Sequence, residues 1–255
     1  MPPDKGEIRI LANAGEIAQA AAVEFVSQAL ESVEKKGFFT FVLSGGSTPR
    51  DLYLLLSSKS KSVSRPRVPW NKIHFFWGDE RHVPPDHTDS NYRMVYETLL
   101  SKMAIPPNNV HRIKAENPNA GKAAEDYERE LREFFMLEPK QPPCFDMVLL
   151  GIGADGHTAS LFPGTEVIYE EQLLVAAPWV ERLNTHRITL TPPTINNANL
   201  IIFLVSGKEK ARALRSVLQG NYQPELFPAQ IIRPIKGRLL WLVDQSAACL
   251  LEMKE

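Results

Sequence analysis

Short, almost continuously apolar segments recur along the chain, and each is bounded by residues that favour turns. They are rich in Phe, Val, Ile and Leu, which is typical of strands buried on both faces of a parallel sheet. We therefore predict strands at Phe38–Leu43, Ile73–Trp77, Phe145–Leu150, Leu200–Val205 and Leu239–Val243. Leu173–Ala176 and Arg187–Leu190 are candidates for further strands.

Between these runs, apolar residues recur at helical spacing. In Ala14–Lys36 they fall every four residues, at Ile17, Ala21, Phe25, Ala29 and Val33. Helices are predicted there and at Pro49–Leu56, Ser90–Met103, Ala120–Met136 and Lys208–Gln219. Strands that alternate with helices predict an α/β fold. Its expected form is a Rossmann-like parallel sheet with helices on both faces, in three layers.

Composition narrows the class of protein. The 255 residues are 44% hydrophobic and 23% charged, which suits a single globular domain over residues 1–255. The net charge of −1 gives no electrostatic reason to expect binding to nucleic acid or to a membrane surface. The start of the chain, Met1–Gly6, has no apolar signal segment, and no apolar run approaches the ~18 residues of a membrane span. We therefore expect a cytoplasmic protein.

The two cysteines, Cys144 and Cys249, are too few and too far apart to suggest a disulfide framework. Each lies beside an apolar run, so we predict buried free thiols.

Polar loops follow four of the predicted strands. They are Ser44–Thr48, Gly78–Arg81, Gly151–His157 and Ser206–Lys210. The carboxyl ends of parallel strands lie at one edge of a sheet, where such folds bind ligands. We therefore expect these loops to converge on one crevice.

The loop Ser44–Thr48 places glycines and hydroxyls between a strand and a helix. Its backbone and side chains could donate hydrogen bonds to a phosphate, which makes all five residues candidates for binding: Ser44, Gly45, Gly46, Ser47 and Thr48. An ordinary strand-to-helix turn with Thr48 as N-cap fits equally well. The pattern is not a Walker P-loop.

The loop Gly151–His157 contains three glycines, and Asp155 and His157 lie close together at its end. A histidine beside an irregular backbone can accept a proton near neutral pH, although a surface histidine in a glycine turn is the alternative. A helix is expected to begin at Thr158. No second His or Cys lies at metal-site spacing, so no metal is predicted, but a metal held by distant residues stays open. No Gly-x-Ser-x-Gly elbow or catalytic cysteine pattern suggests an acyl-enzyme.

The other charged candidates have more ordinary alternatives. Arg81 suits an oxyanion or phosphate, and Asp79 could orient a sugar hydroxyl, unless this segment is a solvated turn. Lys210 is either an anion ligand or a solvated helix lysine. Because side chains alternate between the two faces of a strand, Arg187, Thr189 and Thr191 share one face. Arg187 is either a ligand or, as is more common for a strand arginine, a surface charge.

These loops resemble the glucosamine-6-phosphate isomerase/6-phosphogluconolactonase family, and in particular its lactonases. The matching stretches run in order over nearly the whole chain, and the most specific is Gly153-Ala-Asp-Gly-His-Thr-Ala-Ser-Leu-Phe-Pro163. The others are Leu43–Pro49, Trp77–Pro84 with Ser90–Tyr92, Arg187–Thr191, Gly207–Ala211 and Leu240–Asp244. The chain departs from the pattern at Val243–Ser246 and in the segment Trp179–His186.

The resemblance implies a fold related to glucosamine-6-phosphate deaminase and ribose-5-phosphate isomerase. It implies hydrolysis of 6-phospho-D-glucono-1,5-lactone to 6-phospho-D-gluconate in the pentose phosphate pathway, without a cofactor. Separately, we expect a monomer. His157 would be the base and Asp155 its neighbour. Asp79 and Arg81 would lie in the sugar site, with Arg187 and Lys210 near the phosphate.

Two alternatives were weighed against this interpretation. A deaminase-isomerase of the same superfamily would carry a Glu-Pro dipeptide after the histidine, whereas this chain has Phe162-Pro163. The deaminases also have Asp-Glu-Tyr where this chain has Asp79-Glu80-Arg81. A non-catalytic sugar-phosphate sensor would need a DNA-binding segment, and no spare segment here carries a net basic charge.

Overall fold

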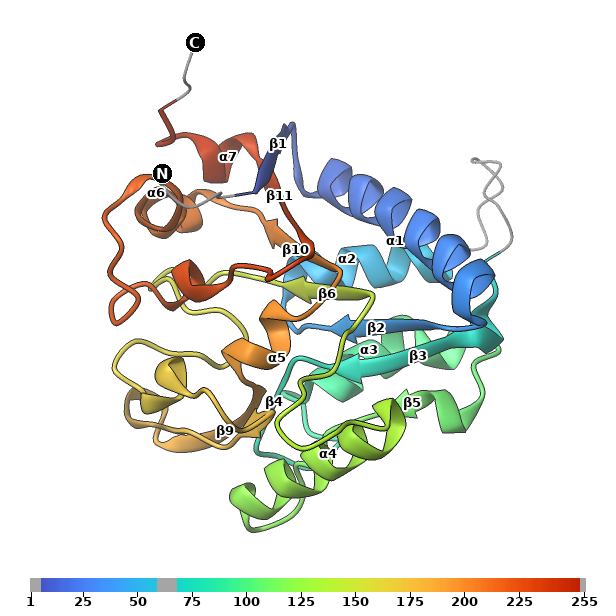
Figure 1. The fold of residues 1–255 in the computed structure, drawn as a ribbon. Coiled ribbons are helices and arrows are strands. Elements are labelled where there is room, and N and C mark those ends of the chain that lie inside the picture. Colours follow the sequence, from blue (N-terminus) through green and yellow to red (C-terminus); the bar gives the residue numbers. More distant parts are fainter. Residues whose placement is uncertain (1–5, 59–67, 253–255) are drawn as a thin grey trace.

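A central sheet of parallel strands organises the molecule (Figure 1). The computed structural model describes residues 6–58 and 68–252. In spatial order the strands are β1 (Glu7–Leu11), β11 (Arg238–Asp244), β10 (Leu200–Val205), β6 (Met147–Leu150), β2 (Phe39–Leu43), β3 (Ile73–Trp77) and β5 (Val110–His111). All five predicted strands are confirmed, each within two residues at either end. The edge strands β1 and β5 were not predicted.

Helices cover both faces of this sheet, which confirms the predicted three-layer α/β architecture. The chain crosses the sheet in one direction from β1 to β5 and then returns to β11. Right-handed crossovers place the helices of the two passes on opposite faces. Figure 1 shows α2 and α3 behind the sheet and α4 and α5 in front of it. The helices are α1 (Ala14–Lys36), α2 (Ser47–Ser57), α3 (Asn91–Thr98), α4 (Ala120–Phe135), α5 (Pro192–Asn196), α6 (Ala211–Gln219) and α7 (Gln245–Ala248).

Helix α1 has the bounds that the sequence predicts, because both ends carry capping residues. Asn13 accepts a hydrogen bond from the Glu16 backbone, and Gly37 ends the helix in the left-handed conformation. Two other helices are shorter than expected. The segment after α3 becomes a 3-10 turn at Leu100–Lys102, and Lys208–Lys210 forms a 3-10 turn before α6.

A small antiparallel sheet lies beside the carboxyl ends of the main strands (Figure 1). Its strands are β4 (Asp79–Arg81), β9 (Thr185–Leu190), β7 (Val175–Ala176) and β8 (Trp179–Val180). β7 and β9 confirm the two candidate strands, with shifted bounds. β4 was not predicted because three consecutive charged residues are typical of a turn; Gly78 alone separates it from β3.

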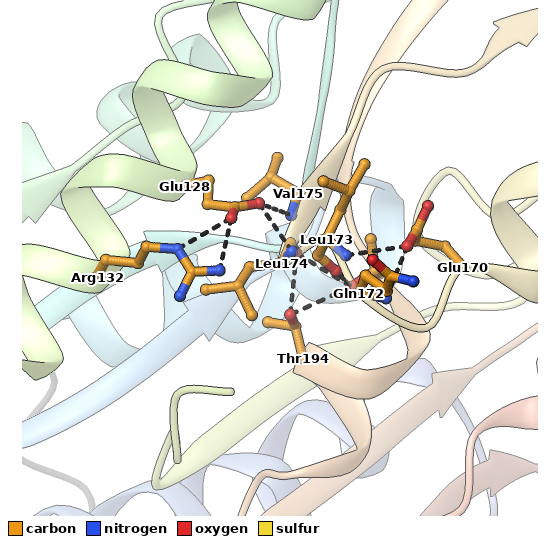
Figure 2. A network of polar contacts seen from close by, with 9 residues as sticks. Glu128, Arg132, Glu170, Gln172, Leu173, Leu174, Val175 and Thr194 are labelled. Atoms are coloured by element: carbon orange, nitrogen blue, oxygen red, sulfur yellow. Dashed lines mark hydrogen bonds and ion pairs between the residues drawn. The ribbon is translucent and has the colours of Figure 1, made fainter. Parts of the chain in front are cut away.

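Helix α4 anchors this small sheet through the carboxylate of Glu128 (Figure 2). One oxygen accepts the backbone N–H of Leu174 at 2.8 Å and of Val175 at 3.3 Å, while the other pairs with Arg132 at 2.8 Å. From α5, Thr194 donates to the Leu174 carbonyl at 2.9 Å. These contacts fix the start of β7, and with it the position of β9 beside the main sheet.

Two expectations about local structure are wrong. Cys144 and Cys249 are free but exposed, since one follows a proline-rich connection and the other follows the end of α7. No helix begins at Thr158. Thr158 and Leu161 instead form an isolated bridge, and Ala159 has a φ of 46°, outside the right-handed helical region.

Among the described residues, no helix combines the length and apolar character needed to cross a membrane. The expectation about a signal segment concerns the first residues of the chain, and residues 1–5 lie outside the described range.

Candidate active site

The four polar loops line one cavity of about 320 Å³ at the carboxyl ends of the main strands. Of the candidate residues, this cavity is lined by Ser44, Gly45, Gly46, Ser47, Thr48, Asp79, Arg81, His157 and Lys210. Asp155 and Arg187 are not among its lining residues. The cavity is also lined by Asn91 and Ala159, which lie outside the four predicted loops, and by Ser206 and Glu209 of the fourth loop.

The Ser44–Thr48 loop is held rigidly by buried Tyr53. The Tyr53 hydroxyl accepts the Ser44 N–H at 3.0 Å and donates to the Ser44 carbonyl at 2.9 Å. Helix α2 begins at Ser47, and its N-cap is Gly46 at φ 105° with no side-chain cap. The alternative of a turn capped by Thr48 is therefore wrong. Uncapped N–H groups at the start of an 11-residue helix face the cavity region and favour an anion.

Ser44 contributes a further unsatisfied group. Its side chain is 5% exposed, and its Oγ has no hydrogen-bond partner among the described residues. Because Ser44 also lines the cavity, this hydroxyl is available to a polar atom of a bound molecule.

His157 and Asp155 form a close pair at the cavity edge. His157 Nδ1 lies 2.5 Å from Asp155 Oδ1, so Nε2 is the ring nitrogen left for other partners. The pair sits over Gly153, where a Cβ would lie 2.0 Å from His157 Nδ1. The loop is closed by a backbone hydrogen bond of 2.8 Å from the Gly153 N–H to the His157 carbonyl.

The second oxygen of Asp155 contacts Arg182, 2.5 Å away, a residue that sequence reasoning missed. Burial acts to raise the pKa of Asp155. The hydrogen bond with His157, together with the charges of His157 and Arg182, outweighs this effect and brings the pKa to about 2. Asp155 is therefore an anion over the whole physiological pH range.

Strand β4 directs Asp79 into a buried polar network. Asp79 is 7% exposed, and its Oδ2 accepts the Ser160 hydroxyl at 2.7 Å. Asn91 donates to the Asp79 carbonyl at 2.9 Å. Burial of this carboxylate excludes the alternative of a solvated charged turn.

Glu80 points elsewhere, toward the N-terminus of α3. Its carboxylate accepts backbone N–H groups of Arg81, Asn91 and Tyr92 at 2.7–2.8 Å. Burial raises the pKa of Glu80 to about 7, against these hydrogen bonds. Glu80 thus serves the local structure and ties α3 to the strand that carries Asp79 and Arg81.

Arg81 and Arg187 face each other in register across β4 and β9. Burial lowers the pKa of Arg187, and the charge of Arg81 lowers it further. Arg81 lines the cavity and Arg187 lies beside it, so the two guanidinium groups make this end strongly positive.

Lys210 lines the cavity from the loop after β10. The loop is shaped by buried Asp244, a second residue that sequence reasoning did not assign to the site. Asp244 accepts the Ser206 hydroxyl at 2.5 Å and the Gly207 N–H at 3.2 Å. It also accepts the Ala247 N–H at 2.7 Å, which joins this loop to α7.

The arrangement therefore combines a histidine–carboxylate pair with several groups whose charge and donors suit an anion. Within the two described ranges, no three His, Cys, Asp or Glu side chains are grouped to hold a metal ion. Acid–base chemistry on an anionic substrate is the reaction type that these groups can support.

Comparison with known proteins places the chain in a family. The family model for glucosamine-6-phosphate isomerases/6-phosphogluconolactonase matches residues 12–241. The chain belongs to this family, which confirms the resemblance noted in the sequence. A relative from Synechocystis sp. (strain ATCC 27184 / PCC 6803 / Kazusa), named 6-phosphogluconolactonase, is 38% identical over 241 residues, covering 94% of this chain and 96% of the relative.

Solved structures agree with this assignment. The 6-phosphogluconolactonase of Trypanosoma brucei superposes with a TM-score of 0.84 at 30% identity, covering 97% of this chain and 99% of that one. A monomeric glucosamine-6-phosphate deaminase superposes with a TM-score of 0.80 at 21% identity, covering 96% of this chain and 100% of that one. The second likeness concerns the fold alone and confirms the predicted relation to the deaminase fold.

Proposed function

We propose that this protein hydrolyses 6-phospho-D-glucono-1,5-lactone to 6-phospho-D-gluconate, as in the oxidative pentose phosphate pathway. The observation that carries the proposal is the His157–Asp155 pair at the edge of a cavity that is also lined by Arg81, Lys210 and the start of α2. Membership of the family and relatives named 6-phosphogluconolactonase support it.

In the proposed reaction, His157 acts as general base and then as general acid. Neutral His157 takes a proton from water as the water oxygen attacks C1 of the lactone. The C1–ring oxygen bond then breaks, and the imidazolium returns the proton to the leaving ring oxygen. Asp155 orients the ring through Nδ1 and stabilises its charged form, so no acyl-enzyme is needed.

The anion-binding groups are proposed to hold the substrate by its phosphate and sugar hydroxyls. The loop Ser44–Thr48 would donate backbone and hydroxyl hydrogen bonds, with Lys210 and Arg187 supplying positive charge. Asp79 and Arg81 would contact the sugar. Arg187 lies outside the cavity lining, so its contribution would be made from the rim beside Arg81.

The remaining expectations belong to the same proposal. The polar loops of this one chain line the cavity, and we propose that a single domain acts on a small molecule as a monomer. The chemistry needs no metal or organic cofactor, because a lactone is an activated ester and the imidazole handles the proton. The net charge of −1 supports action without nucleic acid or a membrane surface, and we propose that the protein acts in the cytoplasm.

The direct test is hydrolysis of the phosphorylated lactone by the purified protein, corrected for spontaneous hydrolysis. His157→Asn should lose about 10²–10⁴-fold in kcat, the usual contribution of general acid–base catalysis. KM should change far less, because the anion-binding groups are separate from the ring. A near-normal kcat in this variant would exclude His157 as the base.

The deaminase alternative is tested by ammonia release from glucosamine 6-phosphate. The deaminases carry a glutamate at the position of Phe162, and they use its carboxylate in opening the sugar ring. Here the Phe162 ring packs against the His157 ring instead, with centroids 4.3 Å apart. We expect no turnover above background. Efficient ammonia release would replace the lactonase proposal.

A further inference from the structure

Arg182 lies behind the His157–Asp155 pair and not in the cavity. Its Nη2 forms an ion pair with Asp155 Oδ2 at 2.5 Å, without the angles of a hydrogen bond, while His157 occupies Asp155 Oδ1. The two oxygens of one carboxylate therefore link a guanidinium to an imidazole. Arg182 is absent from the cavity lining, and its side chain is 51% exposed.

A second contact joins the same residues through Phe162. The guanidinium carbon of Arg182 lies 4.8 Å from the centre of the Phe162 ring. That ring packs against the His157 ring, with centroids 4.3 Å apart and an interplanar angle of 31°. Phe162 is 5% exposed, so it offers both groups a fixed apolar surface. Asp155 and Phe162 thus couple Arg182 to His157 along two separate sides.

The chain holds Arg182 in place through the connection between β8 and β9. The residue lies in a 3-10 turn, Glu181–Leu183, which ends at Asn184 in the left-handed conformation. Trp179 donates its indole N–H to Glu181 at 2.8 Å, and buried Val180 pairs with Thr185 across the strands. A short, braced turn delivers the guanidinium to Asp155.

We propose that Arg182 is a positioning residue for the proton-transfer step. It fixes the Asp155 carboxylate, which in turn fixes the His157 ring with Nε2 available for water. This inference rests on the proposed role of His157 as general base. Arg182 itself touches neither the cavity nor the reacting atoms.

The charge of Arg182 gives the proposal a signature that a merely structural role lacks. Through Asp155, the Arg182 cation acts on the positive charge that develops on the ring during proton transfer. The other charged side chains that line the cavity with His157 are Asp79, Arg81, Glu209 and Lys210, and they stay the same in the test. Removing the guanidinium should therefore change kcat and move the acid limb of the pH–rate profile to higher pH.

The test compares Arg182→Gln, Arg182→Lys and wild type in the corrected lactone assay from pH 5 to 9. Because the ion pair is half-exposed, we expect a kcat loss of about 3- to 10-fold in Arg182→Gln, with KM changed less than about twofold. The acid limb should move to higher pH. Arg182→Lys should restore the acid limb but only part of kcat, since it keeps the charge and loses the planar fork.

Arg215→Gln is the matched control. Arg215 lies on α6, its side chain is 52% exposed, and it forms an ion pair with Glu252 at 2.7 Å. Its replacement therefore removes a surface ion pair similar to that of Arg182, but one with no link to His157. Its kcat and acid limb should match wild type. Thermal melting of all variants reports any general loss of stability.

The outcomes separate this inference from the proposed function. If Arg182→Gln keeps the wild-type kcat and acid limb while His157→Asn is inactive, the role of Arg182 is overturned and the proposed function stands. A kcat loss that follows lowered melting temperature, with the acid limb unmoved, also overturns it. An active His157→Asn overturns the role of His157 and the role of Arg182 together.

Discussion

Arg81 and Arg187 stand directly opposite each other on antiparallel strands, with their side chains on the same face of the small sheet. The hydrogen bonds of their guanidinium groups go to main-chain carbonyls, of Asp89 at 2.6 Å and of His186 at 3.3 Å. In residues 6–58 and 68–252, neither guanidinium forms an ion pair with a carboxylate. Two like charges held together in this way favour an anionic ligand and disfavour the empty site.

Replacing one of these arginines should separate stability from activity. Arg187→Gln removes the repulsion, so we expect the ligand-free protein to melt at the same temperature or about 1–3 °C higher. Its kcat/KM for the phosphorylated lactone should fall about 10- to 100-fold, because a charge-assisted hydrogen bond is lost. Thermal melting and steady-state kinetics measure the two effects. A clearly destabilised variant with normal kinetics would show that Arg187 serves the fold instead.

Lys210 should act on the phosphate and not on the lactone ring. Lys210→Ala is expected to lower kcat/KM for the phosphorylated lactone by about 10- to 100-fold, the value of one charge-assisted contact. Turnover of unphosphorylated gluconolactone should barely change. Lys208→Ala is the control, since Lys208 is exposed and does not line the cavity. Equal losses on both substrates would place Lys210 elsewhere in the mechanism.

The sequence predicts the centre of the fold well because burial on both faces leaves an unbroken apolar run. The edge strands lack that signal. β1 has charged residues, and its side chains are exposed or half-buried, while β5 is only two residues long and half-buried. Their pairing depends on the neighbouring strands β11 and β3, which lie far away in sequence or beyond an intervening helix. Local patterns carry no information about such partners.

The site also could be predicted only in part. The sequence predicts that the polar loops converge, since the carboxyl ends of parallel strands lie at one edge of the sheet. The supporting residues are not legible, because each acts through a contact made only in the folded chain. Asp244 holds the loop after β10, and Ser160 meets Asp79 across 81 positions. Arg182 reaches Asp155 from one of the two segments that depart from the family pattern. Spacing along the chain cannot reveal these pairs.

Gly153 should be irreplaceable beneath the His157–Asp155 pair. A Cβ there would lie 2.0 Å from His157 Nδ1 and 2.3 Å from Asp155 Oδ1, so Gly153→Ala must displace one or both side chains. We expect a loss of about 10²-fold or more in kcat, since small errors in the position of a base are costly. The comparison is Gly151→Ala, where the added Cβ meets nothing within 4 Å. Gly151→Ala should keep its melting temperature and much more of kcat. Equal kinetics in the two variants would contradict the tight packing over Gly153.

Asp155 should make the stability of the protein depend on pH in the acid range. Its pKa is about 2 in the folded state, against an ordinary value of 3.8 in the unfolded chain. Because the folded pKa is the lower one, the unfolded state binds more protons as the pH falls through this interval. The stabilising contribution is therefore complete above about pH 4 and is lost between about pH 4 and 2. Allowing for solvent screening of a partly exposed group, it is worth about 1–2 kcal/mol.

Asp155→Asn isolates this contribution, since the amide keeps the shape of the side chain and does not titrate. Urea unfolding of both proteins at pH 6, 5, 4 and 3 gives the free energies of unfolding. We expect the wild type to be more stable than the variant by about 1–2 kcal/mol at pH 6 and 5, with the difference shrinking at pH 4 and 3. A difference that stays constant over this range would mean that the carboxylate charge is not what His157 and Arg182 stabilise.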